Sequence, residues 1–149
     1  ILEKAEEVEM EDEAKNHYIG EARFLRGLFY FNLVQYFGGV PLTTETYKYD
    51  YEAAQVPRST AEEVYNFIIE DFEFAEANLP LDDFAGGELA TGRATASAAS
   101  GLLAKVYLTM AGHPLNKGIS HFQKAKDYAQ KVIDLDIYKL IDDYATMFR

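Results

Sequence analysis

The residues best suited to contact a ligand are three tyrosines outside any predicted helix, Tyr47, Tyr49 and Tyr51. They alternate with polar residues, and in an extended segment alternate side chains project from one face. Three rings on one face could cover a flat apolar part of a ligand, with the carboxylate of Asp50 beside them. The same rings could instead pack this segment onto the rest of the protein, as most buried aromatic side chains do. The sequence leaves both uses open.

Other reactive groups do not form recognisable sites. The chain has no cysteine, so disulfides and thiolate metal sites are excluded. Its histidines (His17, His113 and His121) lack the i, i+4 spacing of a helical metal site, and the acids from Asp82 to Glu88 lack the alternation of a calcium loop. No phosphate-binding loop or nucleophile motif occurs. We therefore expect no metal, no cofactor and no enzymatic activity.

The charge and hydropathy of the chain limit the classes of partner that it can bind. The net charge of −11 disfavours nucleic acid, because an acidic surface repels the phosphate backbone. No apolar run reaches the roughly 18 residues of a membrane-spanning helix. We expect a soluble, globular chain without a membrane-spanning helix in this segment.

The stretch EARFLRGLFYFNLVQYFGGVPL, residues 21–42, predicts a long helix capped by Gly38–Gly39. Winding it as a helix gives two apolar faces, and a helix that is apolar on two sides is expected to lie sandwiched between neighbours. Gly27 lowers helix propensity, so we expect a neighbouring helix to approach closely there. The faces are Ala22, Leu25, Phe29, Leu33 and Tyr36, and Phe24, Gly27, Phe31 and Val34.

Two arginines, Arg23 and Arg26, interrupt this apolar stretch. We interpret them as partners of acidic groups or carbonyls where helices meet. A ligand site is the alternative, because a guanidinium forms bidentate pairs with carboxylates.

Three further helices are predicted. Thr60 to Glu63 form a capping box, and the helix that follows turns Val64, Ile68, Phe72 and Ala75 inward. The nearly uncharged stretch 94–112 forms the next helix, whose small residues Ala98, Gly101, Ala104 and Ala111 imply tight contacts on more than one side. The last helix is expected to bury Phe122, Ala125, Tyr128, Ala129, Val132 and Ile133.

These helices form an internal repeat. The apolar helices match at Ala22/Ala99, Leu25/Leu102, Gly27/Ala104 and Tyr30/Tyr107, and the amphipathic ones at Ile68/Ala125, Phe72/Ala129 and Ala75/Val132. A small residue followed three positions later by Tyr resembles the first helix of a tetratricopeptide repeat (TPR), but the connections are too long for its usual length of about 34 residues. We therefore predict an all-α, TPR-like antiparallel helical repeat with long insertions between helices.

Four ordered blocks resemble the SusD/RagB family of surface nutrient-binding lipoproteins of Bacteroidota. They are GEARFLRGLFYFNLVQYFGGVPL, VPRSTAEEVYNFIIEDFEFAEANLP, GRATASAASGLLAKVYLTMAG and FQKAKDYAQKVIDLDIYKLIDDYATMF. The resemblance implies that residues 1–149 are a single helical domain from a longer chain. That longer protein would be a non-catalytic lipoprotein at the outer-membrane surface, which binds oligosaccharides and passes them to a SusC-like TonB-dependent transporter.

Within this resemblance Tyr47, Tyr49, Asp50 and Tyr51 become candidates for carbohydrate binding, since aromatic rings can lie against the apolar faces of sugars. The competing hypothesis is a helical scaffold that binds proteins and has no sugar site. Exposure of the three tyrosines would favour sugar binding, and burial would favour the scaffold. Structural repeat positions are Arg23, Arg26, Gly27, Tyr30, Phe72, Ala104, Tyr107 and Ala129.

Overall fold

The computed structural model describes residues 2–47, 49, 51, 55–81 and 92–138. A short 3-10 helix, η1 (Ala5–Glu7), precedes the α-helices α1 (Asp12–Phe37), α3 (Ala61–Asn78), α4 (Ala96–Ala111) and α5 (Ile119–Asp134). These described residues contain no strand, only an isolated antiparallel bridge between Pro41 and Arg58. The all-α prediction is confirmed. The end of the fourth matching block, from Lys139 onward, lies outside the described residues.

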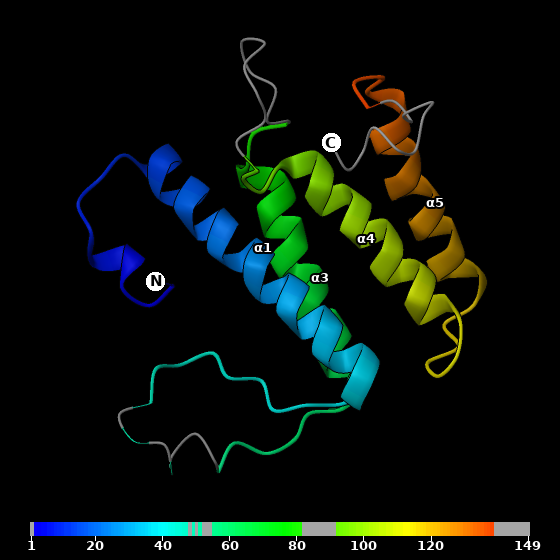
Figure 1. Ribbon diagram of the computed structural model, residues 1–149, viewed down its shortest axis with the longest axis horizontal. Coiled ribbons are helices and arrows are strands. Elements are labelled where there is room, and N and C mark those ends of the chain that lie inside the picture. The colour runs from blue at the N-terminus through cyan, green and yellow to red at the C-terminus, as the bar shows by residue number, and fades with distance from the viewer. Residues whose placement is uncertain (1, 48, 50, 52–54, 82–91, 139–149) are drawn as a thin grey trace, which may run out of the picture.

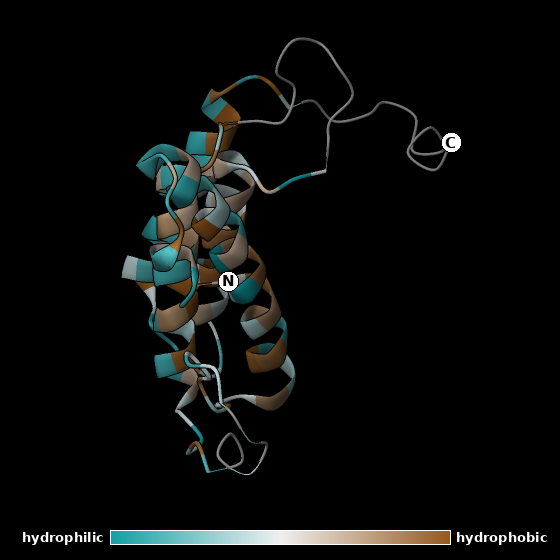
Figure 2. Ribbon diagram, turned by 90° about the vertical axis from the view of Figure 1, so that its left-hand side faces the viewer, coloured by the Kyte–Doolittle hydropathy of each residue, from teal (hydrophilic) through white to brown (hydrophobic). Residues whose placement is uncertain are grey.

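The helices lie in a row, and each runs antiparallel to the one before it. α1 packs on α3, α3 on α4, and α4 on α5 (Figure 1). The helices α1 and α5 therefore stand at the two ends of the row. Hydrophobic residues lie on the outside of the helices as well as between them (Figure 2).

Local signals in the sequence place the helix ends. Thr60 and Glu63 form the predicted capping box at the start of α3, with reciprocal side-chain to backbone bonds. The hydroxyl of Thr95 accepts from the backbone N–H of Ala98 at the start of α4. At the end of α1, Gly38 has a φ of 69°, which favours glycine, and its N–H donates to the carbonyl of Val34.

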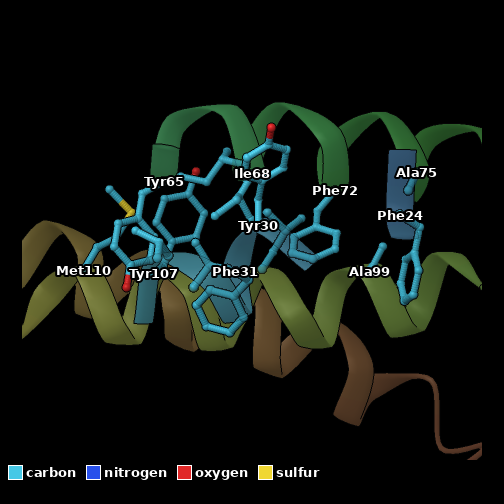
Figure 3. Packing of buried hydrophobic residues seen from close by; sticks show 14 of the residues in the cluster. Phe24, Tyr30, Phe31, Tyr65, Ile68, Phe72, Ala75, Ala99, Tyr107 and Met110 are labelled. Atoms are coloured by element: carbon cyan, nitrogen blue, oxygen red, sulfur yellow. The ribbon is translucent and has the colours of Figure 1, made fainter. Parts of the chain in front are cut away.

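The core lies between α1, α3 and α4 (Figure 3). All four residues predicted to point inward from α3 are fully buried, and so are Leu103 and Val106 of α4. Tyr107 is buried, whereas the repeat positions Ala104 and Ala129 are partly buried.

Gly27 marks the close contact between α1 and α3. A Cβ atom at this position would lie 3.1 Å from Cε1 of Phe72, so the ring fills the space that any larger residue would need. Phe24 flanks the contact, with its ring edge-to-face on Phe72 at a centroid distance of 5.7 Å. The expected close approach of a neighbouring helix at Gly27 is confirmed.

The prediction that α1 is sandwiched is wrong for the described part of the chain. The face with Phe24, Gly27, Phe31 and Val34 is buried, but on the opposite face Leu25, Phe29, Leu33 and Tyr36 are 49%, 61%, 40% and 83% exposed. Periodicity shows which residues share a face and does not show whether a neighbour covers that face. α1 stands at the end of the row, so only one of its faces meets another described helix.

Two smaller expectations fail for the same reason. In α5 only Ala125 is buried, whereas Phe122 and Ile133 are 49% and 67% exposed. In α4 no neighbouring heavy atom lies within 4 Å of a Cβ built on Gly101, and Ala98 is exposed, so these small residues do not make tight contacts. α5 packs mainly on α4 and reaches α3 through side-chain bonds from Tyr128 and Lys131, and the outer side of α4 faces solvent.

Candidate functional site

The long insertion between α1 and α3, residues 40–59, carries the three candidate tyrosines and leaves the row at its lower end (Figure 1). Its two ends are held together at the base. The guanidinium of Arg58 donates from Nε to the carbonyl of Gly39 and from Nη2 to that of Phe37, both at 2.5 Å. The N–H of Ser59 donates to the carbonyl of Val40 at 3.1 Å. Arg58 thus caps the carbonyl end of α1 while closing the insertion.

Gly39 is required at this base. A Cβ atom there would lie 2.0 Å from the backbone oxygen of Ser59, a clash that no side-chain rotation relieves. Gly38 turns the chain out of α1. Gly39 leaves room for the backbone at the end of the insertion, which passes beside it at Ser59. Only the helix-capping role of this glycine pair was predictable from the sequence, because the partner in the second role, Ser59, lies twenty residues later.

Two more hydrogen bonds attach the insertion to the fold. The hydroxyl of Tyr30 accepts from the N–H of Thr43 at 2.8 Å, and the Tyr30 ring packs edge-to-face on Phe67 of α3. The N–H of Thr46 donates to the carboxylate of Glu3 at 2.6 Å, and hydrogen bonds from the Thr46 side chain and then from its backbone lower the pKa of Glu3. Tyr30 is therefore more than a repeat position, since it connects the helical core to the insertion.

Tyr49 and Tyr51 form a stacked pair at the far part of this insertion. Their ring centroids are 5.5 Å apart, the planes differ by 12°, and the residues are 48% and 62% exposed. Tyr47 is partly buried. Asp50 lies outside the described residues. The structure thus brings two of the three predicted tyrosines together on the surface.

A second tyrosine pair provides a comparison, because its rings pack two helices together. Tyr107 of α4 and Tyr128 of α5 stack at 5.6 Å, also with a 12° angle between planes. Tyr107 is buried and Tyr128 partly so, and burial together with nearby Glu73 raises the pKa of both phenols. This pair joins two helices, whereas Tyr49 and Tyr51 join no described helices and present ring surface to solvent.

The two arginines of α1, Arg23 and Arg26, both contact side chains of α3. Arg26 forms two hydrogen bonds of 2.7 Å with Asp71 of α3, which is only 1% exposed. Arg23 lies over the ring of Phe74 at 4.2 Å, and its Nε has no hydrogen-bond partner among the described residues. The interpretation as a helix-contact pair is therefore confirmed for Arg26. For Arg23 the observed contact is with an aromatic ring instead.

A cleft of about 410 Å³, lined by both polar and apolar side chains, opens at the end of the helices away from the insertion, where α4 begins and α5 ends. Its polar groups satisfy one another: Glu76 accepts from Ser100 at 2.5 Å and from Lys131 at 3.1 Å. This cleft therefore presents a closed network rather than free groups for a ligand.

The described helices contain no cluster of three potential metal ligands, and none of them is long and apolar enough to cross a membrane.

Comparison with known proteins identifies the family. Residues 1–108 match the family model of SusD-like proteins described as "starch-binding associating with outer membrane". The chain belongs to the SusD-like family. This family match covers α1, the insertion, α3 and most of α4.

Individual SusD-like relatives agree with this assignment. A SusD-like protein of Bacteroides ovatus is 33% identical over 140 residues, which are 91% of this chain and 24% of the relative. The crystal structure of a SusD homologue from Bacteroides thetaiotaomicron is 33% identical, with a TM-score of 0.85 over 99% of this chain and 28% of that one. The chain therefore spans about a quarter of the length of these relatives.

A third SusD-like structure is described by its ligand. It is a laminarin-binding SusD-like protein, 31% identical, with a TM-score of 0.82 over 99% of this chain and 30% of that chain. SusD-like relatives are thus described as binding proteins, and at least one of them as a binder of a polysaccharide.

Proposed function

We propose that this chain is the helical part of a non-catalytic glycan-binding lipoprotein at the outer-membrane surface. The whole protein would bind oligosaccharides or polysaccharides and deliver them to a SusC-like TonB-dependent transporter. Family membership supports the general role, because the family description links starch binding with the outer membrane. Membrane attachment would come from a lipid anchor outside this segment, and residues 1–149 would be a single helical domain of the longer chain.

We further propose that the insertion between α1 and α3 contributes to glycan binding through Tyr49 and Tyr51, with Tyr47 and Asp50 as further candidates. The observation that carries this proposal is the exposed stacked pair. Stiff aromatic rings provide a large contact area at low entropic cost, and the Arg58 and Tyr30 bonds hold the base of the insertion on the helical core. A platform that is already positioned loses less entropy on binding.

Affinity electrophoresis of the full-length protein through gels that contain different polysaccharides tests both parts of the proposal. We expect the protein to be retarded by at least one polysaccharide. The triple variant Tyr47/Tyr49/Tyr51→Ala should bind roughly a hundredfold more weakly, because each of the three lost aromatic contacts is worth on the order of 1 kcal/mol.

Tyr18→Ala is the matched control, because Tyr18 is a similarly exposed tyrosine in the first half of α1, far from the insertion. Its retardation should equal that of the unmodified protein. If retardation survives the triple substitution, the sugar site lies elsewhere and the proposal for the insertion is wrong. If no polysaccharide retards the unmodified protein, the result favours a protein-binding scaffold over glycan capture.

A further inference from the structure

The segment before α1 is bonded directly to the insertion that carries the tyrosine pair. The backbone N–H of Thr46 donates to the carboxylate of Glu3 at 2.6 Å, across 43 positions of the chain. The Thr46 side chain and then this backbone bond stabilise the ionised carboxylate, which lowers the pKa of Glu3. Glu3 therefore connects two parts of the molecule that are distant in the sequence.

The segment that carries Glu3 has a defined shape of its own. In η1 the N–H of Glu7 donates to the carbonyl of Lys4 at 3.2 Å, which closes one 3-10 turn. The Nζ of Lys4 pairs with the carboxylate of Glu7 at 2.9 Å across the same turn. The segment turns back beside α1 toward the insertion (Figure 1). A short turn next to Glu3 thus helps to direct its carboxylate toward Thr46.

The position of Thr46 along the insertion relates this bond to the tyrosine pair. On the outgoing side the bonds at the base reach as far as Thr43, which lies six residues before Tyr49. Thr46 lies only three residues before Tyr49. A shorter stretch of chain between an anchored residue and the pair samples fewer conformations. The bonds at the base determine where the insertion leaves the helices, and the bond to Glu3 restricts the direction in which its far part projects.

We propose that Glu3 is a positioning residue, which holds the insertion, and with it the stacked pair of Tyr49 and Tyr51, in the orientation that meets a glycan. This inference deepens the proposed function and rests on it for the class of ligand. A carboxylate suits the role, because it offers two acceptor oxygens and, being charged, makes stronger hydrogen bonds than a neutral amide. Holding the pair in one orientation raises affinity, since apparent affinity falls with the fraction of molecules that are competent to bind.

Distances between two spin labels on the full-length protein test the positioning without any ligand. Gln55→Cys places one label on the insertion and Lys126→Cys places the other on α5, and both positions are exposed. The chain has no cysteine of its own, and any cysteine elsewhere in the protein is replaced by serine. We expect Glu3→Ala to broaden the distance distribution about twofold, because the insertion then samples more orientations. Glu9→Ala, which removes an exposed carboxylate from the same segment, is the matched control and should leave the distribution unchanged.

Affinity electrophoresis of the Glu3 and Glu9 variants, without labels, connects the orientation to binding. In every polysaccharide gel that retards the unmodified protein, Glu3→Ala should bind about fivefold more weakly, as expected if about a fifth of the molecules remain competent. Glu3→Gln should lose less, because its amide keeps one acceptor oxygen for Thr46. Glu9→Ala should bind like the unmodified protein. The partial rescue by glutamine separates the hydrogen bond from other effects of removing the side chain.

Each result supports or overturns the positioning role. A broader distance distribution together with weaker retardation in Glu3→Ala supports it. An unchanged distribution overturns it, because Glu3 then does not hold the insertion. A broader distribution with full retardation also overturns it, because the orientation then does not matter for binding. If no polysaccharide retards the unmodified protein, the proposed function fails instead, and the label distances alone support or overturn the positioning of the insertion by Glu3.

Discussion

The contact of α1 with α3 and that of α5 with α4 occupy equivalent places in the repeat, but they are built differently. The first has a buried bidentate ion pair, Arg26–Asp71, and a glycine that lets Phe72 approach the backbone. The second buries a single residue of α5, Ala125, and adds a tyrosine stack and the contact of exposed Lys124 with the ring of Tyr107. Substitutions at the first contact should therefore cost far more stability than those at the second.

The difference also explains how one sequence pattern can serve two purposes. Both α1 and α4 contain a glycine within the helix, but Gly27 faces Phe72 whereas Gly101 faces open space. The spacing of small and apolar residues determines where a helix forms and which of its faces turns inward. The side chains of the neighbouring helix determine how much stability the contact adds. The predictions below test this ranking, with changes in the free energy of unfolding measured by chemical denaturation.

Asp71→Ala should have the largest effect. It leaves the guanidinium of Arg26 without its carboxylate partner in the middle of the α1–α3 contact. Breaking a buried pair costs about 3–5 kcal/mol, and we expect about 3 kcal/mol because the Arg26 side chain remains 21% exposed and can be partly hydrated. Glu70→Ala, which removes the adjacent exposed carboxylate, should change stability by less than about 0.5 kcal/mol. Equal effects of the two substitutions would show that the pair is unimportant.

Gly27→Leu should come next. The new side chain would enter the space that Phe72 fills, and overpacking of this kind costs about 1–3 kcal/mol. Gly101→Leu is the matched control on α4, where the side chain has open space and helix propensity improves by about 0.8 kcal/mol. The same substitution should thus destabilise one helix and stabilise the other. A neutral Gly27→Leu would contradict the close-approach explanation.

The sequence predicted features whose causes are local. The capping box of α3 and the burial of Val64 and Ile68 followed from spacing within one helix, and both are confirmed. The α1–α3 contact at Gly27 was also predictable, because an unfavourable residue inside a helix needs a compensating contact. These inferences required no knowledge of which helices lie side by side.

Features that depend on distant partners could not be predicted in the same way. The exposure of Phe29 depends on what stands beside α1, which hydrophobic periodicity does not encode. Arg58 closes the insertion by reaching carbonyls about twenty positions earlier, and no local motif announces this contact. The candidate site was predictable only as a cluster of tyrosines. Its stacked geometry, and the partial burial of Tyr47 in contrast to the exposed pair, required the fold.

Lys131→Ala should have the smallest effect. Lys131 pairs with Glu76 at 3.1 Å and lies over the ring of Tyr128, but its side chain is 60% exposed. Surface ion pairs contribute about 0–1 kcal/mol, so we expect a loss below about 1 kcal/mol that shrinks as salt screens the charges. Lys126→Ala is the control, since it removes the same charge from an exposed position of α5 and so separates the local pair from the change in net charge. A loss as large as that of Asp71→Ala would overturn the ranking of the two contacts, because it would make an exposed pair as important as a buried one.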